Sequence, residues 1–239
     1  MEMVERVAEV RSRIAAAAAR AGRRESDIRL LAVTKTFPRE TVLSAAAAGL
    51  TLFGENRVQE AEEKFTDIGV PCELHLIGHL QRNKARIAAG LFSWVQSIDK
   101  AETAEALETR CAERGTTMNI LLELNTSGEE SKSGFRSRDE LLGALDSVRS
   151  LSHLAVRGLM TVGPLTDDRN RVRHAFAELR TLFEEITARQ GLSGFDTLSM
   201  GMSGDFELAI EEGSTLVRIG SALFGHREKG AMRPFGSQG

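Results

Sequence analysis

The sequence predicts an α/β fold: a single (β/α)8 (TIM) barrel with one additional helix at its N-terminus. Apolar runs of strand length recur eight times along the chain, and helical segments lie between most of them. A chain of 239 residues is long enough for one large barrel or for two small domains. Because no linker rich in Pro, Gly or Ser divides the chain, we expect one domain over residues 1–239. A doubly wound open sheet is the alternative topology.

The predicted elements follow one another in a regular order. A helix over about residues 1–21 comes first, with Val7, Val10 and Ile14 at helical spacing and Gly22 at its end. The predicted strands are 29–35, 51–55, 73–78, 93–98, 118–124, 154–161, 197–200 and 215–219. Apolar helical stripes run through Val58, Ala61 and Phe65, through Ala104, Leu107 and Cys111, and through Val172, Phe176, Leu179, Phe183 and Ile186. The glycines predicted to end helices are Gly49, Gly90, Gly115, Gly191 and Gly213.

The composition is that of an ordinary soluble globular protein. The net charge of −3 gives no basic footprint for nucleic acid or a membrane surface. No apolar run is long enough to span a bilayer, and the acidic, amphipathic start "MEMVERVAEV" does not resemble a signal peptide. Cys72 and Cys111 are isolated, which indicates free thiols of a cytoplasmic protein and no metal site.

Polar side chains follow the predicted strands where each strand ends. In chain order they are Lys35, Asn56, His79, Asp99, Asn125, Thr161, Ser199 to Ser203, and Arg218. A (β/α)8 barrel carries its active site at the carboxyl ends of its strands. The sequence therefore predicts a functional site at this end of the barrel.

Two glycine-rich stretches follow the seventh and eighth predicted strands. In "MGMSGDFELAI" (200–210), Gly201, Ser203 and Gly204 precede a helix that begins near Asp205. In "RIGSALFG" (218–225), Gly220 and Ser221 open a short terminal helix. Glycines allow a ligand to approach the backbone, and helix N-termini carry unpaired N–H groups. Together these loops predict a phosphate-binding cup.

Lys35 ends the first apolar strand, and we expect the cup to lie across the barrel from it. An aldehyde that carries a phosphate would suit an amine and a phosphate cup together, and pyridoxal 5'-phosphate (PLP) is such a molecule. Arg218 would lie near the ring nitrogen and, because arginine only donates hydrogen bonds, would hold that nitrogen unprotonated. The alternative for Arg218 is a salt bridge to a carboxylate such as Glu55 or Glu123.

Six motifs in order make the chain resemble the PLP homeostasis (YggS/PROSC) proteins nearly end to end. They are "AVTKTFP" (32–38), "FGENRVQEA" (53–61), "HLIGHLQRNK" (75–84), "SGEESKSGF" (127–135), "RGLMTVGP" (157–164) and "LSMGMSGDFELAIEEGSTLVRIGSALFG" (198–225). The resemblance implies a barrel similar to the N-terminal domain of alanine racemase. It also implies that PLP is held on Lys35 as a Schiff base. The remaining implied contacts are Asn56 and His79 on the cofactor face, Met160 near the ring, Arg218 at the pyridine nitrogen, and Ser203, Gly220 and Ser221 on the phosphate.

Lys132, in "SKSG" after the fifth strand, is a second candidate for a transient PLP acceptor, the alternative being a solvated loop lysine. The chain departs from the family pattern at Leu74, where an aromatic residue is common, and at Arg57, where tyrosine is common. Neither position is an expected contact of the Schiff base.

The family resemblance favours a non-catalytic PLP carrier that serves intracellular PLP homeostasis and delivers the cofactor to apoenzymes. A PLP-dependent racemase-like enzyme is the alternative, with His79 as the opposing base. A two-base racemase needs a proton acceptor on each face of its substrate. Alanine racemases supply a tyrosine from a second domain across a dimer, whereas this chain has no tyrosine and ends soon after the eighth strand. We therefore expect a monomer without turnover. A class I aldolase, with Lys35 attacking a sugar-phosphate carbonyl, is a third possibility.

Overall fold

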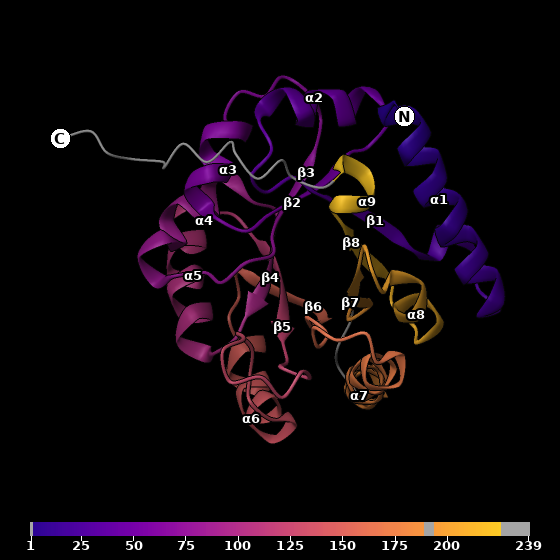
Figure 1. Ribbon diagram of the computed structural model, residues 1–239. Helices are drawn as coiled ribbons and strands as arrows, with labels where there is room; N and C mark the ends of the chain where they lie inside the picture. The colour runs from indigo at the N-terminus through magenta and orange to yellow at the C-terminus, as the bar shows by residue number, and fades with distance from the viewer. Residues whose placement is uncertain (1, 189–193, 226–239) are drawn as a thin grey trace.

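The protein folds as a closed barrel of eight parallel strands surrounded by helices (Figure 1). The computed structural model describes residues 2–188 and 194–225. The strands are β1 (Arg29–Val33), β2 (Leu52–Glu55), β3 (Glu73–Leu76), β4 (Trp94–Ile98), β5 (Met118–Glu123), β6 (Leu154–Met160), β7 (Thr197–Met202) and β8 (Leu216–Ile219). The α-helices are α1 (Met3–Arg20), α2 (Arg39–Ala47), α3 (Val58–Phe65), α4 (Ala85–Leu91), α5 (Ala101–Arg114), α6 (Arg138–Arg149), α7 (Arg169–Ala188), α8 (Phe206–Glu211) and α9 (Ser221–Phe224). Two short 3-10 helices are η1 (Glu25–Asp27) and η2 (Arg82–Lys84).

The strand order β1-β2-β3-β4-β5-β6-β7-β8 closes because β1 pairs in parallel with both β2 and β8. This confirms the predicted (β/α)8 barrel and all eight predicted strands, and the open-sheet alternative is wrong. β7 runs two residues beyond its predicted end, whereas β1 ends at Val33, so that Lys35 lies in the loop that follows.

Successive residues of each strand face two different cores. In β1, Leu30 and Ala32 belong to the main core between the strands and the helices, whereas Leu31 and Val33 belong to a separate small cluster. Because side chains alternate across a strand, that small cluster lies inside the barrel. A second inner cluster contains Trp94, Leu121 and Met160. The barrel interior is therefore packed, as in other barrels of this class.

Most of the predicted helix-ending glycines adopt the left-handed backbone that such positions require. Gly49, Gly115 and Gly213 have φ of 86°, 62° and 100° after α2, α5 and α8. The prediction for Gly90 is wrong, because this residue lies within the last turn of α4. A Cβ built on Gly90 would lie 3.1 Å from the guanidinium carbon of Arg114, so the glycine makes room for a side chain of α5. Gly191 lies outside the described residues.

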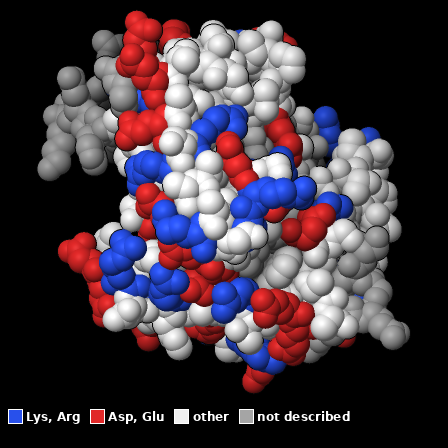
Figure 2. Space-filling view, turned by 90° about the vertical axis from the view of Figure 1, so that its right-hand side faces the viewer, with Lys and Arg blue, Asp and Glu red and all other residues white. Residues whose placement is uncertain are grey.

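Helix α1 packs against α8 and α9, next to the place where the barrel closes (Figure 1). Arg13 and Arg20 form ion pairs with Glu207 and Glu211 of α8 at 2.9 and 3.0 Å. Beyond α1, Arg23 donates from Nη1 to the carbonyl of Ser214 at 2.8 Å. Figure 2 shows this side of the molecule, where basic and acidic side chains alternate over the surface. The predicted N-terminal helix is confirmed; Met1 lies outside the described residues.

Both cysteines are free in the structure, Cys111 buried within α5 and Cys72 half-buried before β3. Burial raises the pKa of both thiols, which lowers their reactivity. None of the helices in the described ranges is long and apolar enough to cross a membrane.

Candidate functional site

The carboxyl ends of the strands bring Lys35 close to the loop that follows β8. β1 and β8 are paired neighbours, with Ala32 opposite Ile219. A Cβ built on Gly220 would lie 3.5 Å from the carbonyl oxygen of Val33. The expectation that the cup lies across the barrel from Lys35 is therefore wrong. Barrel closure makes the first and last strands adjacent, although they are the most distant in sequence.

The backbone on both sides of Lys35 is held by side chains. Thr34 is fully buried, its Oγ1 donates to Glu55 Oε1 at 2.7 Å, and its carbonyl accepts a hydrogen bond from Lys64 Nζ at 2.7 Å. On the other side, the N–H of Thr36 donates to Glu60. Thr36 has φ of 67°, a conformation that a β-branched residue rarely adopts. These contacts fix the course of the chain through Lys35, which is itself half-buried.

Lys64 links the contacts on the two sides of Lys35. Its ammonium forms ion pairs with Glu55 and Glu60, both at 2.7 Å, and only 9% of its side chain is exposed. Burial raises the pKa of Glu55, and Lys64 opposes this shift. Glu55 Oε2 is buried and has no hydrogen-bond partner among the described residues. Removing an ammonium and two carboxylates from water costs free energy. The contacts of Lys64 with the backbone and side chains around Lys35 give this cluster a structural role.

The predicted phosphate cup is assembled from the loops after β7 and β8. Ser203 Oγ accepts hydrogen bonds from the backbone N–H groups of Gly220 and Ala222 at 3.2 and 3.3 Å. Ser221 is exposed beside them at the start of α9. Gly201 has φ of 94°, and a Cβ there would lie 2.5 Å from Ala209 Cβ. Ser203 Oγ therefore accepts from two backbone N–H groups of the kind that bind phosphate oxygens at such loops.

Arg218 lies on β8 beneath this cup and is 4% exposed. Its Nη1 donates to Ser199 Oγ and its Nη2 donates to the carbonyl of Thr161, both at 2.7 Å. Burial lowers the pKa of Arg218 to about 10, opposed by the charges of Glu123 and Asp205. Arg218 therefore stays protonated at neutral pH and can only donate hydrogen bonds.

Glu55 and Glu123, the carboxylates predicted as alternative partners of Arg218, differ in their relation to it. Glu55 belongs to the Lys64 cluster and forms no ion pair with Arg218 in the described part of the chain. Glu123 acts on Arg218 through its charge. Burial raises the pKa of Glu123 to about 7, with Arg218 lowering it and Asp99 raising it further. A carboxyl group that titrates near neutral pH thus lies at the mouth of the barrel.

The remaining predicted cofactor contacts come from three strand ends. His79 follows β3 and forms an ion pair through Nδ1 with Asp99 Oδ2 at 2.9 Å, with 41% of its side chain exposed. Asn56 follows β2, and its backbone packs so closely on Gly78 that a side chain could not replace that glycine. Met160 is fully buried in the inner cluster with Trp94. Met160 therefore borders the site from within the barrel, whereas His79 reaches solvent.

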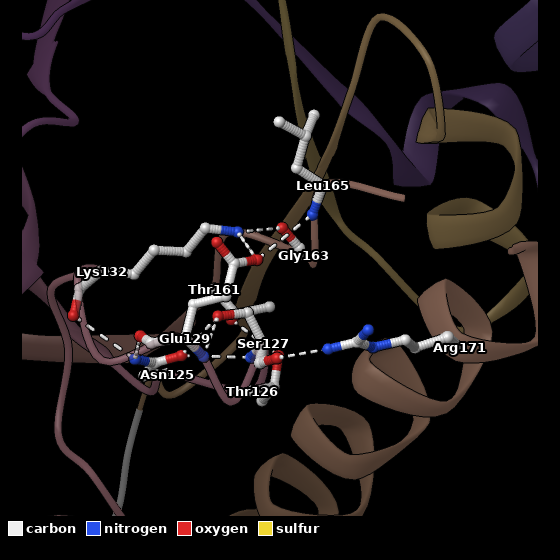
Figure 3. Close-up of polar contacts among 9 residues, drawn as sticks. All are labelled: Asn125, Thr126, Ser127, Glu129, Lys132, Thr161, Gly163, Leu165 and Arg171. Atoms are coloured by element: carbon white, nitrogen blue, oxygen red, sulfur yellow. Dashed lines mark hydrogen bonds and ion pairs between the residues drawn. The ribbon is translucent and has the colours of Figure 1, made fainter. Parts of the chain in front are cut away.

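Lys132 lies in the loop between β5 and α6, which Asn125 organises (Figure 3). Asn125 Nδ2 donates to the carbonyls of Glu129 and Lys132 at 2.9 and 3.3 Å, and Oδ1 accepts from Ser127 Oγ at 2.8 Å. Lys132 Nζ pairs with Glu129 at 2.8 Å and donates to the carbonyl of Gly163 at 2.9 Å. Lys132 therefore ties this loop to the loop after β6, and it is not a freely solvated lysine.

Sequence reasoning missed Lys64 and Glu60, although a signal was present. Lys64 lies three residues after Ala61, on the same helical stripe as the buried Val58 and Phe65. A lysine on a buried stripe needs a charged partner. His75 and Gln96, which are polar residues within apolar strands, were also missed; both are fully buried.

Comparison with known proteins identifies the class and then the family. Residues 6–228 match the family model described as alanine racemase, N-terminal domain. The fold and the site thus define a barrel of the alanine racemase N-terminal type. The pyridoxal phosphate homeostasis protein of Pseudomonas aeruginosa is 44% identical over 230 residues, covering 96% of this chain and 97% of the relative. That of Escherichia coli (strain K12) is 40% identical over 240 residues, covering 95% and 97%. The chain belongs to the family of pyridoxal phosphate homeostasis proteins.

A solved structure of a relative extends this likeness. PipY of Synechococcus elongatus, determined with PLP bound, is 33% identical, with a TM-score of 0.83. The match covers 94% of this chain and 100% of PipY. The resemblance expected from the six motifs is confirmed.

Proposed function

We propose that this barrel binds PLP and serves PLP homeostasis, with Lys35 as the amine that holds the cofactor. The observation that carries the proposal is the adjacency of the loop after β1, which holds Lys35, and the cup of Ser203, Gly220 and Ala222 in the loops after β7 and β8. Its support from relatives is membership of a family named for PLP homeostasis and a similar structure that holds PLP. When bound, PLP supplies an aldehyde that condenses reversibly with an amine.

The residues of the chain have distinct parts in this binding. Lys35 provides the amine on a backbone that the Lys64 cluster holds in place. Gly220, Ser221 and Ser203 bind the phosphate through N–H and hydroxyl groups. Arg218 donates a hydrogen bond to the ring nitrogen and so keeps that nitrogen an acceptor, which weakens the ring as an electron sink. A site built in this way favours holding the cofactor over carbanion chemistry.

Three further side chains border the ring in this proposal. Met160 contributes an apolar contact from inside the barrel, and Asn56 and His79 line the face at the ends of β2 and β3. Lys132 is the second candidate acceptor. To react, Lys132 would have to leave Glu129 and Gly163 and also lose a proton, because only the neutral amine is a nucleophile.

A racemase-like activity is the second candidate function, and one observation favours it. His79 pairs with Asp99 through Nδ1, the arrangement that orients an imidazole as a general base. The chain contains no tyrosine to play that part. We nevertheless expect no turnover. Incubating the PLP-loaded protein with L-alanine in D2O tests this, and deuterium at Cα that disappears in His79→Gln would establish the enzyme.

Cofactor binding is tested by the visible absorption spectrum of the purified protein, before and after borohydride, beside Lys35→Ala. We expect a band that borohydride removes, with the mass of reduced PLP fixed on Lys35. Lys100→Ala, an exposed lysine after β4, is the matched control and should keep the band. A protein that stays colourless with added PLP would contradict the proposal and favour the aldolase-like reading.

The wider setting belongs to the same proposal. We expect one cytoplasmic PLP-binding domain that acts as a monomer and passes PLP to apoenzymes. Light scattering during size-exclusion chromatography measures the oligomeric state. Transfer is measured as the activity recovered by a PLP-dependent apoenzyme when it is mixed with the loaded protein.

A further inference from the structure

A continuous chain of hydrogen bonds crosses the barrel interior and ends on Arg218. Arg218 Nη1 donates to Ser199 Oγ at 2.7 Å, and Ser199 Oγ donates to Gln96 Oε1 at 2.7 Å. Gln96 Nε2 lies 2.7 Å from His75 Nδ1, and His75 Nε2 lies 2.8 Å from Glu73 Oε1. His75, Gln96 and Ser199 are completely buried. This hydrogen-bond chain thus starts at Glu73, the first residue of β3, and ends at Arg218 below the proposed cofactor site.

The two ends of this hydrogen-bond chain, together with a neutral His75, fix the direction of every bond in it. A guanidinium only donates and a carboxylate only accepts. Ser199 therefore accepts from Arg218 and donates to Gln96 Oε1, which leaves the Gln96 amide group to donate to His75 Nδ1. His75 must then carry its proton on Nε2, where it donates to Glu73. With His75 neutral, a reversed Gln96 would require the proton on Nδ1 and would set an unprotonated Nε2 against the Glu73 carboxylate.

The surroundings of His75 agree with a neutral imidazole. Its ring stacks on Trp94 with centroids 4.9 Å apart, and Gln96 of β4 and Glu73 of its own strand face its two nitrogens. Arg29 of β1 donates to Glu73 Oε2 at 2.7 Å, which satisfies part of that carboxylate's charge. Burial, with the nearby charge of Arg29, lowers the pKa of His75, and Glu73 opposes this.

We propose that Ser199, Gln96 and His75 are positioning residues for Arg218, holding its guanidinium plane in the orientation that presents a donor to the ring nitrogen of PLP. The inference rests on the proposed function, because it takes that ring as the ligand of Arg218. A planar guanidinium is fixed once two of its nitrogens are bonded to different groups. Here those groups are Ser199 and the carbonyl of Thr161. Without the hydroxyl, one anchor remains and the plane can turn about it.

The decisive comparison is Ser199→Ala against Ser214→Ala. Both serines are completely buried, and Ser214 Oγ donates to the carbonyl of Met200 on β7 at 2.8 Å without bonding any member of the hydrogen-bond chain. We expect both variants to trap PLP on Lys35 with borohydride. Ser199→Ala should raise the dissociation constant of PLP about tenfold, the usual cost of a lost buried hydrogen bond, and should shift the absorption maximum of bound PLP. Ser214→Ala should change neither.

Gln96→Leu tests the hydrogen-bond chain at a residue that does not contact Arg218. We expect it to reproduce the spectral shift of Ser199→Ala, whereas Ser199→Thr should restore the wild-type spectrum. If Ser199→Ala and Gln96→Leu bind PLP with wild-type affinity and spectrum, the inference is wrong and the proposed function stands. If wild-type protein does not trap PLP on Lys35, it is the proposed function that fails.

Nitrogen-15 NMR of the cofactor-free protein gives a readout that does not depend on PLP. In wild type we expect neutral His75 protonated on Nε2 at pH 7, together with slow rotation of the Arg218 guanidinium. Gln96→Glu places a carboxylate against Nδ1 and should convert His75 to the imidazolium. Ser199→Ala should speed the guanidinium rotation, and Ser214→Ala should not. An Nδ1–H tautomer in wild type, or equal rotation in the two serine variants, would overturn the inference.

Discussion

Lys64 Nζ donates a hydrogen bond of 2.7 Å to the carbonyl of Thr34, the residue that directly precedes Lys35. The same ammonium pairs with Glu60, which accepts from the N–H of Thr36 on the other side of Lys35. One buried lysine from α3 therefore controls the backbone at the proposed reactive lysine. Its separation in sequence from Lys35 conceals this relationship, and the pairing of β1 with β2 creates it.

Replacing Lys64 with methionine should destabilise the protein and reduce PLP loading. The substitution leaves the buried Glu55 and the half-buried Glu60 without their cation, and breaking a buried pair in this way costs about 3–5 kcal/mol. We expect a loss of about 3 kcal/mol or more in urea unfolding at pH 7. We also expect less borohydride-trapped PLP on Lys35 at a temperature where the variant is folded. Lys100→Met, at an exposed position, is the control, and equal unfolding midpoints for the two variants would refute the role given to Lys64.

Glu123 should make stability fall as the pH rises from about 4.5 to about 7. Its pKa is about 7 in the folded protein against 4.5 for a model carboxyl group, so the folded state binds the proton more tightly across this window. At about 1.4 kcal/mol per pH unit, the loss amounts to about 3 kcal/mol by pH 8.

Glu123→Gln mimics the protonated carboxyl and should remove this pH dependence. The variant should be more stable than wild type at pH 8 and nearly equal to it at pH 5. Subtracting the wild-type curve from the variant curve isolates Glu123 from other groups such as His75. His75 acts in the opposite sense, because its lowered pKa costs stability as the pH falls below about 6.5. A flat difference curve would show that Glu123 titrates normally.

Gly201→Ala should damage the phosphate cup, whereas Gly204→Ala should be tolerated. Gly201 combines φ of 94° with a built Cβ 2.5 Å from Ala209, so alanine is strained and also displaces α8. Around Gly204, no atom of the described residues lies within 4 Å of such a Cβ. We expect a loss of about 2 kcal/mol or more for Gly201→Ala and of less than about 0.5 kcal/mol for Gly204→Ala. Thermal unfolding of the two variants measures this, and similar midpoints would argue against a strained cup.

Lys132→Met should slow the release or transfer of PLP without abolishing binding at Lys35. The substitution removes both the second amine and the tie between the loops after β5 and β6. Lys132→Arg separates these roles, since arginine can keep contacts with Glu129 and Gly163 but cannot condense with an aldehyde. Rates of apoenzyme activation measure the effect. If Lys132→Arg shows the wild-type rate, Lys132 acts only by holding the two loops together. If Lys132→Met leaves the rate unchanged, Lys132 has neither role.

Local sequence patterns were sufficient to predict the elements of the fold. The apolar strands, the stripe through Val172 and Ile186, and the short helix after Gly220 are found as expected, because alternation and helical spacing report burial on one face. The prediction that Gly90 ends a helix was wrong because the small size of this residue makes room for Arg114 of the next helix. That contact joins two elements, so a local sequence pattern does not report it. Lys35, Arg218 and the glycine-rich loops could be placed at one end of the barrel, since all parallel strands finish there.

The sequence by itself determined the barrel, the position of the proposed reactive lysine and the polar loops at the strand ends, because these follow from periodicity and chain order. Only the tertiary structure decided which groups meet. Closure set Gly220 beside Val33, α3 brought Lys64 to Thr34, and the inward faces of four strands joined Arg218 to His75. These pairings depend on strand register and on side-chain direction within a closed barrel, and local sequence encodes neither.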